Sequence, residues 1–271
     1  MTDRYAVIGN PIHHTKSPLI HGMFAAATGQ DIEYGAIEGP MDGFRAVVES
    51  FRDSGGRGMN VTAPFKLQAC ELADEASERA QLAGAANALK FDAGRTVADN
   101  FDGIGLVTDI QRSVKVAGKR VLLLGAGGAA RGAVLPLLEQ KPAVLTIVNR
   151  SLAKAGLLAE KLSSRGPVVS AGYADVSGDR FDIVINATSA SLRGELPPLP
   201  AGVFGHDCLA YELVYGKGLT PFLRLAQNAG VKRLADGVGM LVEQAAEAFA
   251  WWRGVRPDTR AVIERLTVAL K

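Results

Sequence analysis

The chain has 271 residues, 48% apolar and 21% charged, which excludes global disorder and provides enough apolar side chains for two modest domains. Its 30 Lys and Arg against 28 Asp and Glu leave a net charge of +2, too small to attract nucleic acid or an anionic membrane. The two cysteines are too few for a disulfide scaffold or a four-thiolate zinc site, and the opening residues lack a long apolar run. We therefore expect a cytoplasmic protein with neither a nucleic-acid partner nor a membrane span.

Short apolar segments bounded by Gly, Asn, Asp or Pro predict buried strands. In chain order they are residues 5–8, 32–36, 58–61, 121–124, 144–148 and 181–185. Helix-length segments alternate with them and carry start signals, with Ser17 before Pro18 as the simplest helix cap, Thr220 before Pro221, and Asp258 before the last segment. This alternation predicts an α/β fold with parallel sheets covered by helices on both faces.

A glycine-rich turn, GAGGAARG, follows the predicted strand 121–124 and opens a predicted helix. Gly125, Gly127 and Ala130 match the GxGxxA pattern, in which glycines let the backbone approach a pyrophosphate at the helix N-terminus. A turn that only packs a helix on a sheet is the alternative. The context favours a dinucleotide site formed by Gly125, Ala126, Gly127, Gly128 and Ala129. Because the turn lies well inside the chain, the residues before it form a separate unit.

The segment VNRSLAK follows the next predicted strand, where an NAD-binding fold usually carries an acid for the ribose hydroxyls. No acid is present. Donors and positive charge come instead from Asn149, Arg150, Ser151 and Lys154. These groups suit the extra phosphate of NADP, although a solvated helix start would show the same residue types. The sequence therefore favours NADP over NAD.

Polar clusters also follow the earlier predicted strands, at the sheet edge where open α/β folds bind ligands. The segments HTKSP, NVTAPFK and DNFDG, together with Asn87, offer hydroxyls, amides, a cation and a carboxylate. A small molecule with several hydroxyls and one carboxylate needs this combination of groups in one pocket.

With these motifs in this order, the chain resembles the shikimate dehydrogenase family, NADP-dependent enzymes of aromatic amino acid biosynthesis that interconvert shikimate and 3-dehydroshikimate. The match covers AVIGNPIHHTKSPLIH, NVTAPFK, DNFDGIG, GAGGAARG, the Asn149–Arg150 pair, NATS at 186–189, YGKGLTPFL and ADGVGMLVEQAAEAF. The resemblance implies a substrate domain at 1–103, a Rossmann-like NADP domain with a parallel sheet at 104–237, and C-terminal helices at 238–271 that pack on the substrate domain. The protein is expected to be a monomer or homodimer.

The resemblance assigns the catalytic pair to Lys66 and Asp102. Reducing a ring ketone creates an alkoxide, so a proton donor must lie within reach of that oxygen, and a carboxylate can hold the ammonium there. Taken alone, the two residues could equally be an exposed lysine and a helix cap. The resemblance further places six residues around the substrate: Thr15, Ser17, Thr62, Asn87, Tyr215 and Gln244. It puts Thr188 and Gly237 near the nicotinamide.

The chain departs from its family at several polar positions. Phe101 occupies the position of Thr in the family's usual NTD triplet, and Ala88 follows Asn87 where the family generally has Thr. Thr15 replaces the first Ser of the family's SKSP segment, and YEL at 211–213 stands where YDM is common. We expect Phe101 to put a bulky ring into the substrate pocket and to alter turnover or substrate preference. Relatives acting on quinate or an aminoshikimate analogue, and a non-catalytic dinucleotide sensor, stay open as alternatives.

The four histidines lack metal-ligand spacing, so we expect no metal.

Overall fold

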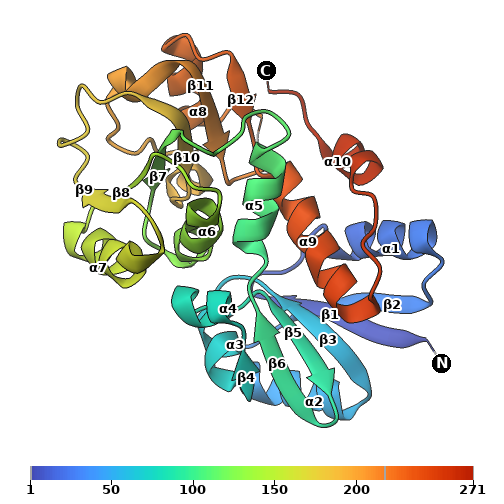
Figure 1. The fold of residues 1–271 in the computed structure, drawn as a ribbon. Coiled ribbons are helices and arrows are strands. Elements are labelled where there is room, and N and C mark those ends of the chain that lie inside the picture. The colour runs from blue at the N-terminus through green and yellow to red at the C-terminus, as the bar shows by residue number, and fades with distance from the viewer. Residues whose placement is uncertain (1, 217, 271) are drawn as a thin grey trace. The chain divides into compact units, whose positions relative to one another are not determined.

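The computed structural model describes residues 2–216 and 218–270. The chain forms two compact units (Figure 1). The first comprises Met1–Gly105 and Val242–Glu264, and the second comprises Leu106–Leu241 and Arg265–Lys271. Each unit is built around its own six-stranded sheet.

The sheet of the first unit has the strand order β2-β1-β3-β5-β6-β4. Its strands are β1 (Asp3–Gly9), β2 (Ile32–Glu38), β3 (Gly56–Val61), β4 (Glu75–Ala76), β5 (Ala88–Asp92) and β6 (Arg95–Asp99). Strands β1, β2 and β3 are parallel, whereas β5 runs antiparallel to both β3 and β6. The expected parallel arrangement therefore holds for β1, β2 and β3, and β5 departs from it. The antiparallel pairing of β5 with β6 follows from a two-residue turn, Ala93 and Gly94, both with positive φ, because such a turn joins antiparallel strands only.

Helices cover both faces of this sheet. The helices of the first unit are α1 (Ser17–Thr28), α2 (Phe44–Asp53), α3 (Lys66–Leu72), α4 (Glu78–Ala83), the first turn of α5 (Asp102–Ile110), most of α9 (Val238–Arg253) and most of α10 (Arg260–Leu266). Phe44 and Val48 of α2 share a core with Ile8 and Met59 of the sheet. On the other face Trp252 of α9 stacks on Tyr5 at 4.8 Å. Residues 242–264 therefore complete the first unit.

One predicted helix cap differs from the structure. Helix α1 begins at Ser17, with Lys16 in the N-cap position and no side-chain cap, so Ser17 is the first helical residue and not the cap. Pro18 occupies the next position, where its missing N–H costs nothing. Thr220 does cap its helix, since its hydroxyl accepts a hydrogen bond from the Leu223 N–H. The hydroxyl of Ser17 is therefore available for other partners.

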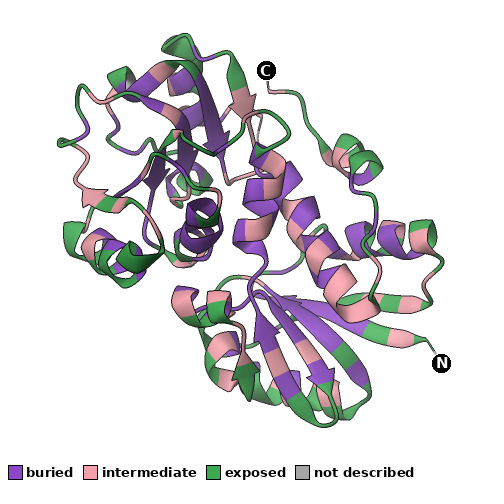
Figure 2. Ribbon diagram, in the orientation of Figure 1, coloured by how far each residue is buried: buried purple, intermediate pink, exposed green. Residues whose placement is uncertain are grey.

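The second unit has an all-parallel sheet with the order β12-β11-β10-β7-β8-β9. Its strands are β7 (Arg120–Leu124), β8 (Val144–Val148), β9 (Val168–Ala171), β10 (Phe181–Asn186), β11 (Phe204–Glu212) and β12 (Arg233–Ala235), and its remaining helices are α6 (Gly128–Glu139), α7 (Leu152–Leu162) and α8 (Pro221–Asn228). The central strands are buried (Figure 2). The strand order reverses between β7 and β10, which is where open α/β sheets bind ligands.

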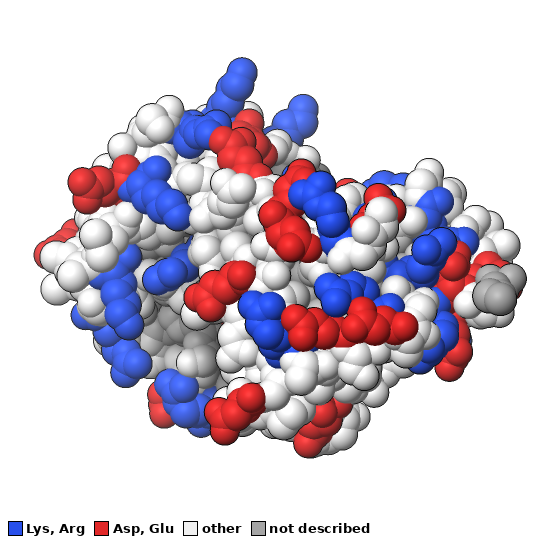
Figure 3. All heavy atoms as spheres, turned by 90° about the horizontal axis from the view of Figure 1, so that it is seen from below, with Lys and Arg blue, Asp and Glu red and all other residues white. Residues whose placement is uncertain are grey.

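The surface carries both signs of charge. On the face drawn in Figure 3, Lys and Arg side chains are interspersed with Asp and Glu side chains. Among residues 2–216 and 218–270, no helix combines the length and the apolar character that crossing a membrane requires.

Candidate functional site

Lys66 and Asp102 form an ion pair in the first unit. Helix α3 begins at Lys66 and α5 begins at Asp102, and Lys66 Nζ lies 2.6 Å from Asp102 Oδ2. The Asp102 side chain is 7% exposed and the Lys66 side chain 23%. A carboxylate in the first turn of a helix is stabilised by the helix dipole and the free amides there. The pair therefore presents a positioned ammonium that still reaches solvent on one side.

Asn87, just before β5, connects this pair to the C-terminal segment. Its Nδ2 donates to Asp102 Oδ1 at 2.8 Å and to Gln244 Oε1 at 3.0 Å, while its Oδ1 accepts the Phe101 N–H at 2.8 Å. Because these three hydrogen bonds of the side-chain amide are all made to protein groups, the orientation of the Asn87 side chain is fixed. The structure thus brings together four of the predicted residues: Lys66, Asp102, Asn87 and Gln244.

Thr15 and Ser17 belong to a second group of hydroxyls. Thr15 Oγ1 donates to Ser17 Oγ at 3.2 Å. The phenol of Tyr34 bonds to the Ser17 hydroxyl and donates to Asn60 Oδ1 at 2.6 Å, and burial raises the pKa of Tyr34 well above its ordinary value. Asn60 Nδ2 in turn donates to the Asn87 carbonyl at 3.2 Å. Hydrogen bonds therefore link Ser17 to Asn87 through Tyr34, a residue that no sequence motif marks.

Two predicted substrate residues are not part of these networks. Thr62 follows β3, and its methyl packs so closely on Gly9 that a Cβ there would lie 2.4 Å from Thr62 Cγ2. Tyr215 belongs to the second unit, after β11, and burial raises the pKa of its phenol.

The ring of Phe101 lies elsewhere than we expected. It is 4% exposed and packs with Ala88 and Ala248 in an apolar cluster, 5.6 Å from the Trp251 ring. The guanidinium of Arg79 lies over it at 5.0 Å. Only the backbone of Phe101 joins the polar network, through its N–H. The expectation that Phe101 fills the substrate pocket is therefore wrong.

The second unit contains a cavity of about 430 Å³ at the carboxyl ends of its central strands. It is lined by residues 125–129, Asn149, Arg150, Tyr173, residues 187–190, Arg193 and residues 195–198. Gly125 has φ +113° and lies against the Ala187 carbonyl, whereas a Cβ on Gly127 or Gly128 would meet nothing within 4 Å. Open space therefore lies above the glycine turn at the start of α6, where a pyrophosphate can meet the helix amides. This part of the cavity is open to the pyrophosphate of a dinucleotide.

The predicted cofactor residues divide between this cavity and its surroundings. The glycine turn, Asn149, Arg150 and Thr188 line it. Ser151 caps α7 by accepting the Lys154 N–H at 3.4 Å, and neither residue is among those lining the cavity. Gly237 is buried where a Cβ would lie 2.1 Å from the Leu213 carbonyl oxygen. Three polar residues of the lining, Tyr173, Arg193 and Glu195, lie in segments without a recognisable motif and were not predicted from the sequence.

A buried carboxylate supports one wall of the cavity. Asn186 Oδ1 accepts the backbone N–H of Thr188 at 3.1 Å and its hydroxyl at 2.7 Å. Glu212 Oε2 accepts from Asn186, Ser191 and Thr220 at 3.0, 2.5 and 3.0 Å. Glu212 is fully buried, and burial raises its pKa. This carboxyl therefore holds the loop after β10 in shape.

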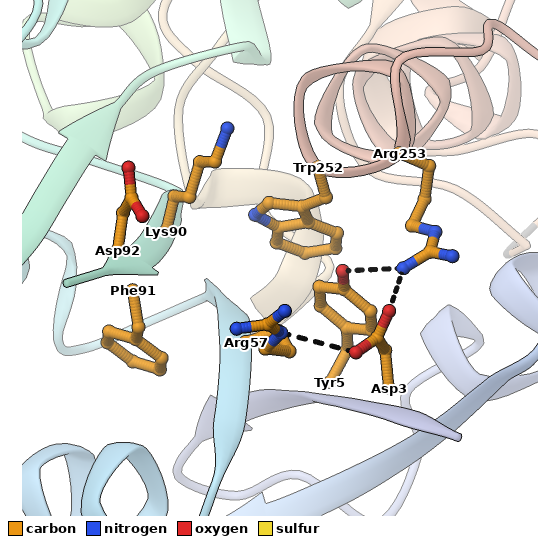
Figure 4. A pocket seen from close by; sticks show the side chains of 8 residues that line it. All are labelled: Asp3, Tyr5, Arg57, Lys90, Phe91, Asp92, Trp252 and Arg253. Atoms are coloured by element: carbon orange, nitrogen blue, oxygen red, sulfur yellow. Dashed lines mark hydrogen bonds and ion pairs between the residues drawn. The ribbon is translucent and has the colours of Figure 1, made fainter. Parts of the chain in front are cut away.

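A smaller cavity of about 190 Å³ lies at the amino ends of β1 and β3 (Figure 4). Its lining consists of Asp3, Tyr5, Arg57, Lys90, Phe91, Asp92, Trp252 and Arg253. The Asp3 carboxylate pairs with both Arg253 and Arg57, and its pKa is lowered chiefly by the Arg253 hydrogen bond. Two of the three cations are thus paired with one carboxylate of the protein, at the sheet edge opposite Lys66. We assign no ligand to this cavity.

Comparison with known proteins gives matches along most of the chain. Residues 7–89 match the model of the shikimate dehydrogenase substrate binding domain, residues 108–193 that of shikimate / quinate 5-dehydrogenase, and residues 237–267 that of the shikimate 5'-dehydrogenase C-terminal domain. The shikimate dehydrogenase (NADP(+)) of Nitrosospira multiformis is 56% identical over 100% of this chain and 99% of its own length.

Solved structures agree with these matches. The crystal structure of an Ael1 enzyme from Pseudomonas putida is 66% identical, covers 100% of both chains and superposes with a TM-score of 0.96. Shikimate 5-dehydrogenase from Thermus thermophilus, solved with NADP(H) and shikimate, is 30% identical over 97% of this chain and 98% of its own, with a TM-score of 0.87. This chain belongs to the shikimate dehydrogenase family.

Proposed function

We propose that this protein is an NADP-dependent oxidoreductase that interconverts 3-dehydroshikimate and shikimate in aromatic amino acid biosynthesis. The observation that carries the proposal is the Lys66–Asp102 pair, held by Asn87, in a chain 56% identical to a named shikimate dehydrogenase (NADP(+)). A sensor without catalysis would need no ammonium held in this way.

Lys66 serves as the proton donor. When a ring ketone is reduced, negative charge develops on its oxygen, and an ammonium within hydrogen-bond reach stabilises that charge and supplies a proton. Asp102 holds Nζ in place at 2.6 Å and accepts from Asn87 with its other oxygen. The nicotinamide of NADPH, when bound, supplies the hydride. In the reverse direction Lys66 takes the proton from the ring hydroxyl.

We assign substrate binding to residues 1–103 with 238–271, and cofactor binding to residues 104–237. The substrate groups within these ranges are Thr15, Ser17, Thr62, Asn87 and Gln244, and we assign Tyr215 of the range 104–237 to the substrate as well. The cofactor groups are residues 125–129, Asn149, Arg150, Ser151, Lys154, Thr188 and Gly237. The open space above the glycine turn and the absence of an acid after β8 support NADP as the cofactor.

We further propose a cytoplasmic location and action on small molecules alone, as a monomer or homodimer. Both cysteines are free thiols, as is usual in a reducing compartment. The interspersed charges on the face in Figure 3 offer no basic surface for nucleic acid.

A direct spectrophotometric assay tests the function. Purified protein is mixed with shikimate or quinate and with NADP⁺ or NAD⁺, and the reduced nicotinamide is followed by absorbance. We expect the highest kcat/KM for shikimate with NADP⁺. Lys66→Met should lower kcat by about 10³-fold, because the proton donor is lost, while NADP⁺ binding stays unchanged. Lys90→Met, a strand lysine of the same unit, is the matched control. Preference for quinate, or binding without turnover, would contradict the proposal.

A further inference from the structure

Arg193 and Glu195 form an ion pair at the wall of the cofactor cavity. Arg193 Nε and Nη2 lie 3.0 and 2.8 Å from the two Glu195 oxygens, and Nη1 donates to Ser189 Oγ at 3.0 Å. Gly194 between them has φ 70°, which turns the chain so that the two side chains meet. Three hydrogen bonds therefore hold one guanidinium in a single orientation on a loop that the sequence motifs do not include.

Arg150 contributes a second guanidinium to the same cavity. It is exposed, and among the residues that the structure describes it forms no ion pair with a carboxylate. The pKa of Glu195 is lowered first by its hydrogen bond to Arg193 and to a lesser extent by the charge of Arg150. The Glu195 carboxylate therefore lies within the electrostatic reach of two arginines, one of which it neutralises.

A carboxylate that binds an arginine in a bidentate way uses the same two N–H donors that a phosphate would use. The cavity has open space at the glycine turn for a pyrophosphate, and the proposed cofactor carries one phosphate more than NAD does. Binding of that dianion near Arg150 brings a stronger anion than Glu195 to the Arg193 guanidinium. Because NAD lacks the phosphate, it would leave the Arg193–Glu195 pair intact.

We propose that Arg193 is a second guanidinium ligand of the 2'-phosphate of NADP and that Glu195 competes with this phosphate for it. This inference rests on the proposed use of NADP. Glu195 holds Arg193 at the cavity when no nucleotide is bound and sets the strength of the preference for the phosphorylated cofactor. Both residues thereby determine cofactor specificity without contacting the substrate.

The test is direct calorimetric titration with NADP⁺, NAD⁺ and adenosine 2'-monophosphate. Glu195→Gln should tighten NADP⁺ and adenosine 2'-monophosphate by about threefold, the effect of one partly exposed charge pair, and leave NAD⁺ unchanged. Arg193→Gln should weaken the two 2'-phosphate ligands by about tenfold and again leave NAD⁺ unchanged. Arg150→Ala serves as the reference for loss of a 2'-phosphate ligand. Glu49→Gln, in the exposed Arg45–Glu49 pair of the other unit, is the matched control and should change nothing.

The outcomes separate this inference from the proposed function. Wild-type protein that binds neither 2'-phosphate ligand would overturn both. Wild-type protein that binds and reduces NADP⁺, with both variants like the control, would overturn only the role of the pair. Equal effects on NADP⁺ and NAD⁺ would also overturn it, because they would assign Arg193 to the pyrophosphate shared by both cofactors.

Discussion

At the scale of single residues, His21 is a histidine buried among aromatic rings. Its ring stacks on Tyr34 at 4.1 Å with the planes 5° apart, and within residues 2–216 and 218–270 neither ring nitrogen has a partner of good hydrogen-bond geometry. Burial lowers the pKa of His21 to about 3, and the nearby Asn60 offsets this only in part. The histidine is therefore neutral in the folded protein at every pH at which the enzyme would work.

This placement predicts acid lability. Because the folded pKa is below the unfolded value of 6.5, the unfolded chain binds the proton first, and stability is lost as the pH falls from 6.5 towards about 3. Between pH 7 and pH 5 the wild type should lose about 2 kcal/mol of unfolding free energy through this residue. His21→Phe should lose correspondingly less, as measured by urea unfolding at both values. His13→Gln, at an exposed position, is the control, and equal pH slopes for wild type and His21→Phe would refute the account.

Phe101 and Ala88 depart from the family pattern together. Both lie in one apolar cluster, so a larger side chain at 101 and a smaller one at 88 exchange volume within the same space. Swaps that conserve volume are tolerated by cores, whereas either change alone leaves a void or a clash. We therefore interpret the two substitutions as a change in the packing of the apolar cluster next to Asp102.

Phe101→Thr should therefore destabilise the protein by about 3 kcal/mol and should not raise kcat/KM for shikimate. Adding Ala88→Thr should recover part of the loss, because the second side chain fills some of the cavity. Thermal unfolding and steady-state kinetics of the single and double variants check this. A gain in catalytic efficiency in the single variant would restore the view that Phe101 restricts the pocket.

At the scale of elements, Glu212 connects the ends of β10 and β11 with the start of α8 through Asn186, Ser191 and Thr220. Burial raises its pKa, so the folded protein binds a proton more tightly than the unfolded chain does. The contribution of this carboxyl to stability is thus present in full below its unfolded pKa of about 4.5 and is lost as the pH rises through the raised folded value.

Glu212→Gln should cost about 1–3 kcal/mol, because one of the two carboxyl oxygens that accept hydrogen bonds from Asn186, Ser191, Thr220 and the Val214 N–H is replaced by an amide nitrogen that cannot accept, and should raise the KM for NADP⁺ through the Thr188 loop. The cost relative to wild type should be largest at acid pH and shrink as the pH rises. Chemical unfolding across a pH series measures it. Glu139→Gln, on the exposed face of α6, is the control, and a pH-independent cost would contradict the assignment.

The elements that sequence predicted are those whose chemistry leaves few choices. A short continuous apolar segment such as 121–124, followed at once by a glycine turn, favours a buried strand, and a glycine turn between a strand and a helix favours a phosphate ligand. The hairpin of β5 and β6 was missed because its short strands mix apolar and polar residues around a turn containing Ala93, where a positive φ is unusual. Tyr34, Arg193 and Glu195 were missed because their roles depend on which loops meet, and no local spacing encodes that.

At the scale of the whole molecule, each unit has its own core and its own part of the chemistry. Lys66, Asp102, Asn87 and Gln244 belong to the first unit and the dinucleotide cavity to the second. The discontinuous boundary, with residues 242–264 returning to the first unit, is visible from sequence only through the family resemblance, since no linker composition marks it.

This division predicts how ligands affect unfolding. Both tryptophans, Trp251 and Trp252, lie in the first unit, so tryptophan fluorescence reports on that unit alone. Shikimate at 100 times its dissociation constant should stabilise the fluorescence transition by about 2.7 kcal/mol, whereas NADP⁺ at the same multiple should shift mainly the circular-dichroism transition. Urea titrations with each ligand measure both signals. If both ligands moved both signals equally, the units would unfold as one.

The hydrogen bond between Asn87 and Gln244 joins positions 157 residues apart. During synthesis the early strands leave the ribosome long before α9 exists, so the rings of Tyr5 and His21 stay uncovered until α9, which carries Phe249 and Trp252, has been made. A product that ended before residue 242 would retain its nucleotide turn and lack the helix that covers this face of the first sheet. Catalytic competence is in this way tied to the synthesis of α9.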